Sequence, residues 1–217
     1  MKNSFFFFFL LFLSYTAQSQ TRALTEDGRE VVLYNNGTWR FQQEQDSTDV
    51  NTAKVDSLPQ NKKKFTRPAG SSFLVKSKAF NIGIYINPSK WTFAPRKDNE
   101  KNPEFRFALK SDDAYAMTVA ESTTIDLDNI RDIALLNAQK VSLDVKETFA
   151  EYRIVNGLKV LCLQFKGTIK GIKFVYYGYY YSNANGTIQM IGYTSQQKFE
   201  SLKSEIENFL NGLVEIN

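Results

Sequence analysis

The chain has 217 residues, of which 42% are apolar and 23% are charged, a balance typical of a folded globular protein and not of a disordered one. It contains no histidine and a single cysteine, which excludes Ser-His and Cys-His catalytic pairs. The formal net charge of +4 is too small for its length to indicate nucleic-acid binding, which depends on clustered phosphate contacts.

The first 19 residues have the pattern of an export signal. Lys2 supplies a positive start, Phe5 to Leu13 form an unbroken apolar run, and Ala17-Gln18-Ser19 offers the small residues that a signal peptidase requires. The run is shorter than the roughly 20 residues of a membrane-spanning helix, and no cysteine near the cut could carry a lipid anchor. We expect residues 1–19 to be removed, leaving a periplasmic or secreted chain with no transmembrane helix and no lipid.

Residues 20–41 predict a small module of short strands. Asn36-Gly37 is a strong hairpin-turn dipeptide, because the two-residue turn needs positive φ at both central positions. Such a turn would place four apolar side chains on one face of the ribbon: Val32, Tyr34, Trp39 and Phe41. An isolated hairpin is marginally stable in water, so this face is expected to pack on the main domain, on a second copy of the chain or on a partner.

Residues 42–71 lose all hydrophobic periodicity. They are rich in Gln, Asp, Ser, Asn and Lys and are interrupted by Pro59 and Pro68, a composition that predicts a disordered polar linker. A run like this is usually solvated, but its basic residues would allow a weak contact with an anionic surface: Lys62, Lys63, Lys64 and Arg67.

Residues 72–217 are expected to form one α+β domain. Alternating apolar residues predict strands at 73–76, 82–86, 105–110, 114–121, 147–155, 159–168, 173–181 and 188–194. Several of these strands are joined by turns too short to hold a helix, such as Asn156-Gly157, so they are predicted to pair in antiparallel fashion.

Two stretches carry apolar residues at the helical spacing. The first runs from about 127 to 140, with Thr124 and Asp126 as candidate caps. The second follows a possible capping box of Thr194 and Gln197, and its apolar positions continue to Leu213. Two helices with one apolar face each predict an antiparallel sheet flanked by helices, an α/β/α sandwich.

The segment 176–181 holds five of the 11 tyrosines. On a strand these side chains divide by parity, so one row belongs to the core and the other could form a partly exposed aromatic ladder, suited to stacking on a sugar ring or a peptide. Packing between strand and helix is the more ordinary interpretation. If a surface here binds a ligand or partner, the candidate residues are Tyr177, Tyr179 and Tyr181, with Tyr34 and Trp39 from the N-terminal module.

Other reactive patterns have simpler explanations. The carboxylate pairs Asp112-Asp113 and Asp126/Asp128 lie at predicted turns or helix starts, where aspartate caps backbone amides. Cys162 stands in an apolar strand and is expected to be buried and unreactive. No phosphate loop or calcium loop is present, so we expect no catalytic residue, no metal and no cofactor.

The segment Ile84-Tyr85-Ile86-Asn87-Pro88-Ser89-Lys90-Trp91, followed by a strand pair, a helix, antiparallel strands and a last helix, resembles the PsbP-like family, which also takes in the Mog-type Ran-binding proteins. The resemblance covers roughly residues 80–214. It implies an α/β/α sandwich that acts as a non-catalytic binding or assembly module, with Trp91 closing one edge of the core. An exported envelope protein that binds an unknown protein partner is therefore expected. The alternatives are a glycan-binding or glycan-processing protein that uses the tyrosine row, and a structural protein that self-associates through the hairpin face.

Overall fold

The computed structural model describes residues 21–24, 30–33, 39–41, 58–97 and 102–216. The chain divides into two compact units, residues 1–49 and 50–217, and each is described by itself. The predicted export signal lies outside the described residues.

The N-terminal unit contains a three-stranded antiparallel sheet in the order β1-β2-β3, formed by Thr21–Leu24, Glu30–Leu33 and Trp39–Phe41. Its register differs from the prediction: Trp39 pairs with Leu33, and Phe41 pairs with Val31. The predicted two-residue turn would have placed Trp39 opposite Tyr34; the predicted turn residues themselves lie outside the described residues. Because a shift by one residue moves every side chain to the other face, the predicted face that combined Val32 with Trp39 and Phe41 is wrong.

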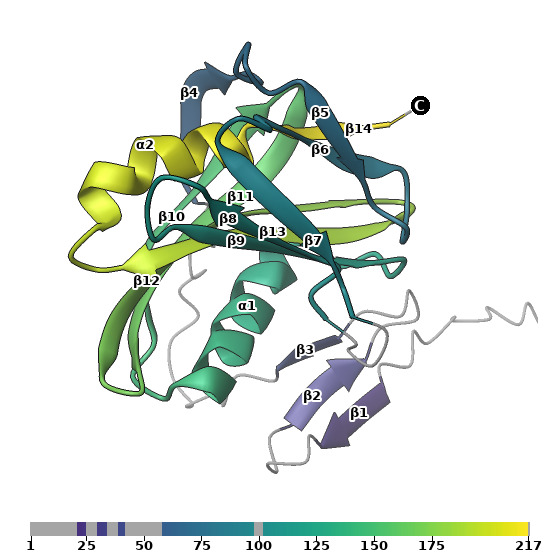
Figure 1. Ribbon diagram of the computed structural model, residues 1–217. Helices are drawn as coiled ribbons and strands as arrows, with labels where there is room; N and C mark the ends of the chain where they lie inside the picture. The colour runs from purple at the N-terminus through teal and green to yellow at the C-terminus, as the bar shows by residue number, and fades with distance from the viewer. Residues whose placement is uncertain (1–20, 25–29, 34–38, 42–57, 98–101, 217) are drawn as a thin grey trace, which may run out of the picture. The chain divides into compact units, whose positions relative to one another are not determined.

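The second unit is built on an eight-stranded sheet in the order β4-β10-β11-β12-β13-β9-β8-β7 (Figure 1). All neighbours are antiparallel except β4, which runs parallel to β10. The strands are Gln60–Phe65 (β4), Trp91–Pro95 (β7), Phe105–Leu109 (β8), Tyr115–Glu121 (β9), Lys146–Val155 (β10), Leu158–Ile169 (β11), Ile172–Asn183 (β12) and Gly186–Ser195 (β13).

Different elements cover the two faces of this sheet (Figure 1). One face carries α2 (Phe199–Leu210) together with a small antiparallel sheet in the order β14-β6-β5, formed by Leu213–Glu215, Ile82–Ile86 and Phe73–Lys76. The other face carries α1 (Leu127–Val141), which packs on β11 and β12. We call these the α2 face and the α1 face. The fold is therefore the predicted α+β sandwich, enlarged by a second small sheet.

The larger core lies under the α2 face. α2 buries five apolar side chains: Phe199, Leu202, Ile206, Phe209 and Leu210. The Trp91 ring lies 4.5 Å from the ring of Phe209, is 2% exposed and donates its indole N–H to Glu205. This confirms that Trp91 closes an edge of the core.

Part of the predicted linker is a strand of the main sheet. Residues 60–65 form β4, whose side chains are mostly exposed except for the buried Phe65. The polar sequence concealed a strand because β4 lies at the sheet edge, where exposed lysines are common. The assignment of 42–71 to a disordered linker is therefore wrong for 60–65, and residues 42–57 lie outside the described residues.

The end of the chain also differs from the prediction. Thr194 lies in β13, and α2 starts after Lys198 without a side-chain cap, so the capping box is wrong. The helix ends at Leu210, and Leu213 begins β14, which pairs with β6. A Cβ at Gly212 would lie 2.0 Å from the carbonyl oxygen of Tyr85, so glycine permits the close approach that turns the helix end into a strand. Among the described residues, no helix is long and apolar enough to cross a membrane.

Candidate functional site

Strand β12 sends its tyrosines to both faces of the sheet, as their alternation predicts. Tyr177, Tyr179 and Tyr181 lie on the α2 face and are buried. Each hydroxyl donates to a side chain of the C-terminal segment, at 3.0 Å for Tyr177 to Glu207 and 3.0 Å for Tyr179 to Asn211, and Tyr181 donates to Glu215. The hypothesis of an exposed row made of Tyr177, Tyr179 and Tyr181 is therefore wrong, because α2 and β14 cover them.

A partly exposed tyrosine row does exist, but it runs across strands on the α1 face. Tyr115 of β9 pairs with Tyr193 of β13, and Tyr193 pairs with Tyr176 of β12. The rings of Tyr115 and Tyr193 are stacked with centroids 5.6 Å apart, and those of Tyr193 and Tyr176 are 5.9 Å apart. Tyr115 is 40% exposed. Sequence reasoning missed this row because its members are distant in the chain.

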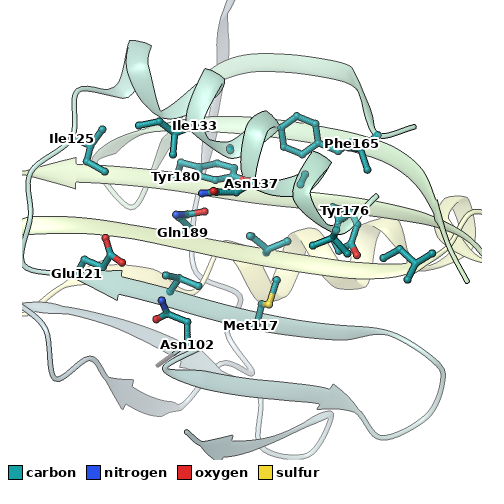
Figure 2. Close-up of a pocket in the computed structure, with 17 residues that line it drawn as sticks. Asn102, Met117, Glu121, Ile125, Ile133, Asn137, Phe165, Tyr176, Tyr180 and Gln189 are labelled. Carbon is teal, nitrogen blue, oxygen red and sulfur yellow. The ribbon is translucent and has the colours of Figure 1, made fainter. Parts of the chain in front are cut away.

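Next to this row, a cavity of about 410 Å³ lies between α1 and the α1 face of the sheet (Figure 2). We call it the α1 groove. Its volume falls within the range of roughly 300–1,000 Å³ that is typical of small-molecule sites. It is lined by Asn102, Met117, Val119, Glu121, Ile125, Ile133, Ala134, Asn137, Ala138, Val141, Val145, Phe165, Ile169, Tyr176, Tyr180, Gln189 and Ile191.

The groove exists because α1 covers only part of its face. α1 contacts β11 and β12, while the adjoining strands β13 and β9 present half-buried apolar residues such as Ile191, Met117 and Val119. The small side chains of Ala134 and Ala138 face the cavity. An amphipathic helix with small residues on its apolar face leaves space over a sheet that larger residues would fill.

The start of α1 is tightly defined. Asp126 caps the helix by accepting a 3.0 Å hydrogen bond from the backbone N–H of Asp128, which confirms one of the two predicted caps. Thr124 is not a cap, because its hydroxyl donates to the carbonyl oxygen of Asn183. The Tyr152 hydroxyl donates to the carboxylate of Asp128, so both aspartates form hydrogen bonds that hold the start of the helix.

Further anchors hold the body and the end of α1. The Arg131 guanidinium donates to both carboxylate oxygens of Glu147 at 2.8 and 2.5 Å. Beyond the helix, the Asp144 carboxylate accepts from Ser142 Oγ at 2.6 Å and from the Thr168 backbone N–H at 2.9 Å. These hydrogen bonds, that of Ser142 first, lower the pKa of Asp144 to about 2. The wall of the groove is thus fixed along its length.

Five uncharged polar side chains line the groove, Asn102, Asn137, Tyr176, Tyr180 and Gln189, and three of them, Tyr180, Asn137 and Gln189, lie close together. Figure 2 shows them grouped beneath α1. The Tyr180 side chain is only 2% exposed, and burial raises the pKa of its phenol, so it stays neutral. Among the described residues, nothing forms a hydrogen bond with the Tyr180 hydroxyl or with the Gln189 amide, whereas Asn137 accepts a long one, 3.5 Å, from Lys140.

Charge is nearly absent from the lining. Of the 17 lining residues, Glu121 alone carries a charge, and it is exposed. Burial also raises the pKa of Tyr176. The groove therefore offers an apolar surface, aromatic rings and neutral hydrogen-bonding groups, with no cation in its lining to attract an anion.

The remaining candidates have structural roles or lie beyond the described part. Cys162 is buried, and burial raises the pKa of its thiol to about 12, which confirms the expected unreactive residue. Asp112 and Asp113 both accept from Lys198 Nζ, at 2.6 and 2.7 Å, and Asp112 also accepts the Asp113 backbone N–H. No group of three or more potential metal ligands occurs within the described ranges.

The binding candidates Tyr34 and Trp39 belong to the N-terminal unit, which is described by itself. Tyr34 lies outside the described residues, and Trp39 is placed only through its strand, β3. The basic residues Lys62, Lys63 and Lys64 are exposed on β4, and Arg67 follows it with its guanidinium 4.1 Å from the ring centroid of Tyr85. Contact of these residues with an anionic surface stays a prediction.

Comparison with known proteins bears on the fold alone. No family model and no curated protein matches the chain. Among solved structures, the cyanobacterial PsbP protein CyanoP from Synechocystis sp. PCC 6803 matches with 12% identity and a TM-score of 0.50, over 68% of this chain and 94% of that chain. LpqN from Mycobacterium tuberculosis, described as involved in cell envelope biogenesis, matches with 11% identity and a TM-score of 0.50, over 67% of this chain and 90% of that chain. The chain therefore has the PsbP-like fold that the sequence resemblance predicted.

Proposed function

We propose that this protein is an exported, non-enzymatic binding module that works in the cell envelope by holding an apolar group of a partner in the α1 groove. The observation that carries the proposal is the lining of the groove, which is apolar and neutral over a volume suited to a ligand. The predicted export signal and the fold shared with LpqN, a protein involved in cell envelope biogenesis, support the envelope as its place of action.

The partner expected from the PsbP-like resemblance is a protein, and the N-terminal unit is proposed as a second contact. Two tethered contacts raise the effective concentration of the second one. Residues 20–49 can be deleted without touching the main sheet, whereas a deletion to residue 71 would remove β4. Thermal unfolding of the shortened chain shows whether it folds, and weaker capture of the same partner by the folded short form supports the second contact.

Capture from a detergent-solubilised envelope extract tests the proposal. The bait is the mature chain, residues 20–217, and Asn137→Trp fills the groove from an exposed position on α1. Ser204→Trp, at an exposed position on α2, is the matched control on the other face. We expect the wild type and Ser204→Trp to retain the same proteins or lipids and Asn137→Trp to lose them. Equal retention by all three would refute binding through the groove.

A second candidate function, glycan binding, is favoured by the tyrosine row of the α1 face. Tyr115 is 40% exposed and stacks on Tyr193, which makes a flat aromatic surface of the kind that packs on sugar rings. Retention of the mature protein on insoluble cell-wall polysaccharide, lost in Tyr115→Ala and kept in Phe149→Ala, would support it. Phe149 is a fair control because it is similarly exposed, at 38%, on β10.

A further inference from the structure

The α1 groove contains hydrogen-bonding groups that the protein itself leaves unused. The Tyr180 phenol and the Gln189 amide line the cavity, and neither has a hydrogen-bond partner among the described residues. Within this part of the chain, the buried side-chain atom without a hydrogen-bond partner is Thr118 Oγ1 and neither of these groups. The Tyr180 hydroxyl and the Gln189 amide therefore reach the open groove, where water or a ligand can bond to them. A polar group on a ligand would supply the missing partner.

On the opposite face of the same strand, the tyrosine hydroxyls do form hydrogen bonds within the protein. Tyr177, Tyr179 and Tyr181 each donate to a carboxylate or amide of α2 or the segment after it. Tyr180 stands between two of them in sequence, is equally buried and has no such partner. Because all four tyrosines belong to one strand, the difference in hydrogen bonding comes from the cavity next to Tyr180 and not from the residue type.

The charges around the groove restrict the ligand further. No lysine or arginine occurs among the lining residues, and the one charged group is the carboxylate of Glu121. Moving an anionic head group from water into this lining would be unfavourable, because nothing there replaces its hydration. Uncharged polar side chains fit a neutral group that both donates and accepts, such as a hydroxyl or an amide.

We infer that the α1 groove binds a neutral amphiphile: a small molecule with an extended apolar part and an uncharged hydroxyl or amide group that meets Tyr180 and Gln189. This inference rests on the proposed function, because it names the kind of partner that the groove holds. The apolar part contacts half-buried side chains of β9, β13 and α1, namely Met117, Val119, Ile191 and Ile133, and its burial drives binding.

A displacement experiment on the mature chain tests the ligand class. The neutral dye N-phenyl-1-naphthylamine reports occupancy by fluorescence, and its competitors are 1-decanol, decanoate at pH 8 and decylammonium, which share one chain length. We expect 1-decanol to displace the dye and decanoate to be at least about tenfold weaker, since the groove has no cation to pair with a carboxylate. Equal potency of 1-decanol and decanoate would overturn the inference.

Single-atom variants test the hydrogen bond. Tyr180→Phe removes only the hydroxyl and should lower the affinity for 1-decanol by about tenfold. Tyr181→Phe, on the same strand but on the α2 face, should leave this affinity unchanged. An unchanged affinity in Tyr180→Phe contradicts the assigned contact. Nuclear Overhauser contacts from 1-decanol to the methyl groups of Val119, Ile133 and Ile191 in the wild type are expected, and their absence also contradicts it, whatever the variants do.

The outcomes separate this inference from the proposed function. If Asn137→Trp loses a captured envelope protein and the wild type binds neither the dye nor 1-decanol, the proposed binding function is supported and the inferred class of ligand is refuted. Binding of 1-decanol at the groove with capture unaffected by Asn137→Trp would support the ligand class and refute capture through the groove.

Discussion

The two faces of the main sheet are built from the same strands but are covered to different extents. The α2 face is closed: a helix with large apolar residues and a second small sheet cover it, and the hydroxyls of Tyr177, Tyr179 and Tyr181 are all bonded. The α1 face is covered by a helix that contacts two strands and leaves a cavity beside it. A sandwich can thus take its stability from one face and keep the other available for a ligand.

A buried charge marks the closed face. The Arg153 side chain, 7% exposed, donates to Glu151, Glu207 and Tyr179 at 2.5, 2.7 and 2.9 Å. The corresponding ion pair on the open face, Arg131 with Glu147, has an arginine side chain that is 39% exposed. Because solvent screens exposed pairs and not buried ones, the two arginines should differ strongly in their effect on stability.

The largest effect is therefore expected from Arg153→Ala. The substitution leaves the carboxylates of Glu151 and Glu207 without the cation that pairs with them, and we expect it to lower the free energy of unfolding by about 4 kcal/mol. Arg131→Ala should lower it by less than about 1 kcal/mol. Urea unfolding followed by circular dichroism measures both, and similar values for the two variants would contradict the division into a closed and an open face.

The next largest effect is expected when apolar side chains of the two helices are truncated. Ile206 of α2 is fully buried, so Ile206→Ala should cost about 3 kcal/mol through lost burial and the cavity left behind. Ile133 of α1 is half-buried and lines the groove, so Ile133→Ala should cost about 1 kcal/mol or less and weaken dye binding. A larger loss for Ile133→Ala than for Ile206→Ala would show that α1 packs more tightly than its cavity indicates.

The third comparison uses neighbouring tyrosines of β12. Tyr179→Phe removes hydrogen bonds to Arg153 and Asn211 and should lower the free energy of unfolding by about 1–2 kcal/mol. Tyr180→Phe removes a hydroxyl without a partner among the described residues, so its effect should be close to zero. Thermal unfolding of the two variants without ligand measures the difference, and a clear destabilisation by Tyr180→Phe would mean that its hydroxyl is already bonded.

Local patterns in the sequence were enough for most of the fold. The bounds of β5 and β6 were predicted at both ends, and α1 was predicted to within one residue, because alternation and helical spacing dominate in these segments. β4 was missed because its lysines face solvent at a sheet edge. The hairpin register was wrong by one residue, because β2 and β3 pair Leu33 with Trp39 and not Tyr34 with Trp39. Both errors concern features that tertiary contacts decide.

Only part of the candidate site could be predicted from the sequence, because the rest also depends on tertiary contacts. The parity of the β12 tyrosines was correct, but alternation cannot say which face is covered more completely, since that depends on α2, β14 and β6 packing together. The row of Tyr115, Tyr193 and Tyr176 arises from the pairing of β9 with β13, strands separated by some 70 residues. Tyr115 and Tyr193 had no local signal that would have joined them.

The smallest effect concerns the anchor beyond α1. The pKa of Asp144 is lowered to about 2 by hydrogen bonds from Ser142 and Thr168, while its ordinary value is 3.8. A lowered folded-state pKa means that this contribution is fully present above the unfolded-state value of 3.8, decreases below it, and is lost as the pH falls through about 2. Because the carboxylate is exposed, Asp144→Asn should shift the midpoint of thermal unfolding only slightly at pH 6 and by less at pH 2, where about half of the carboxylate is protonated in the folded state. An NMR titration of Asp144 should give a midpoint well below 3.8. A midpoint at the ordinary value would show that the loop after α1 is not held, and that the wall of the groove is free to move at that end.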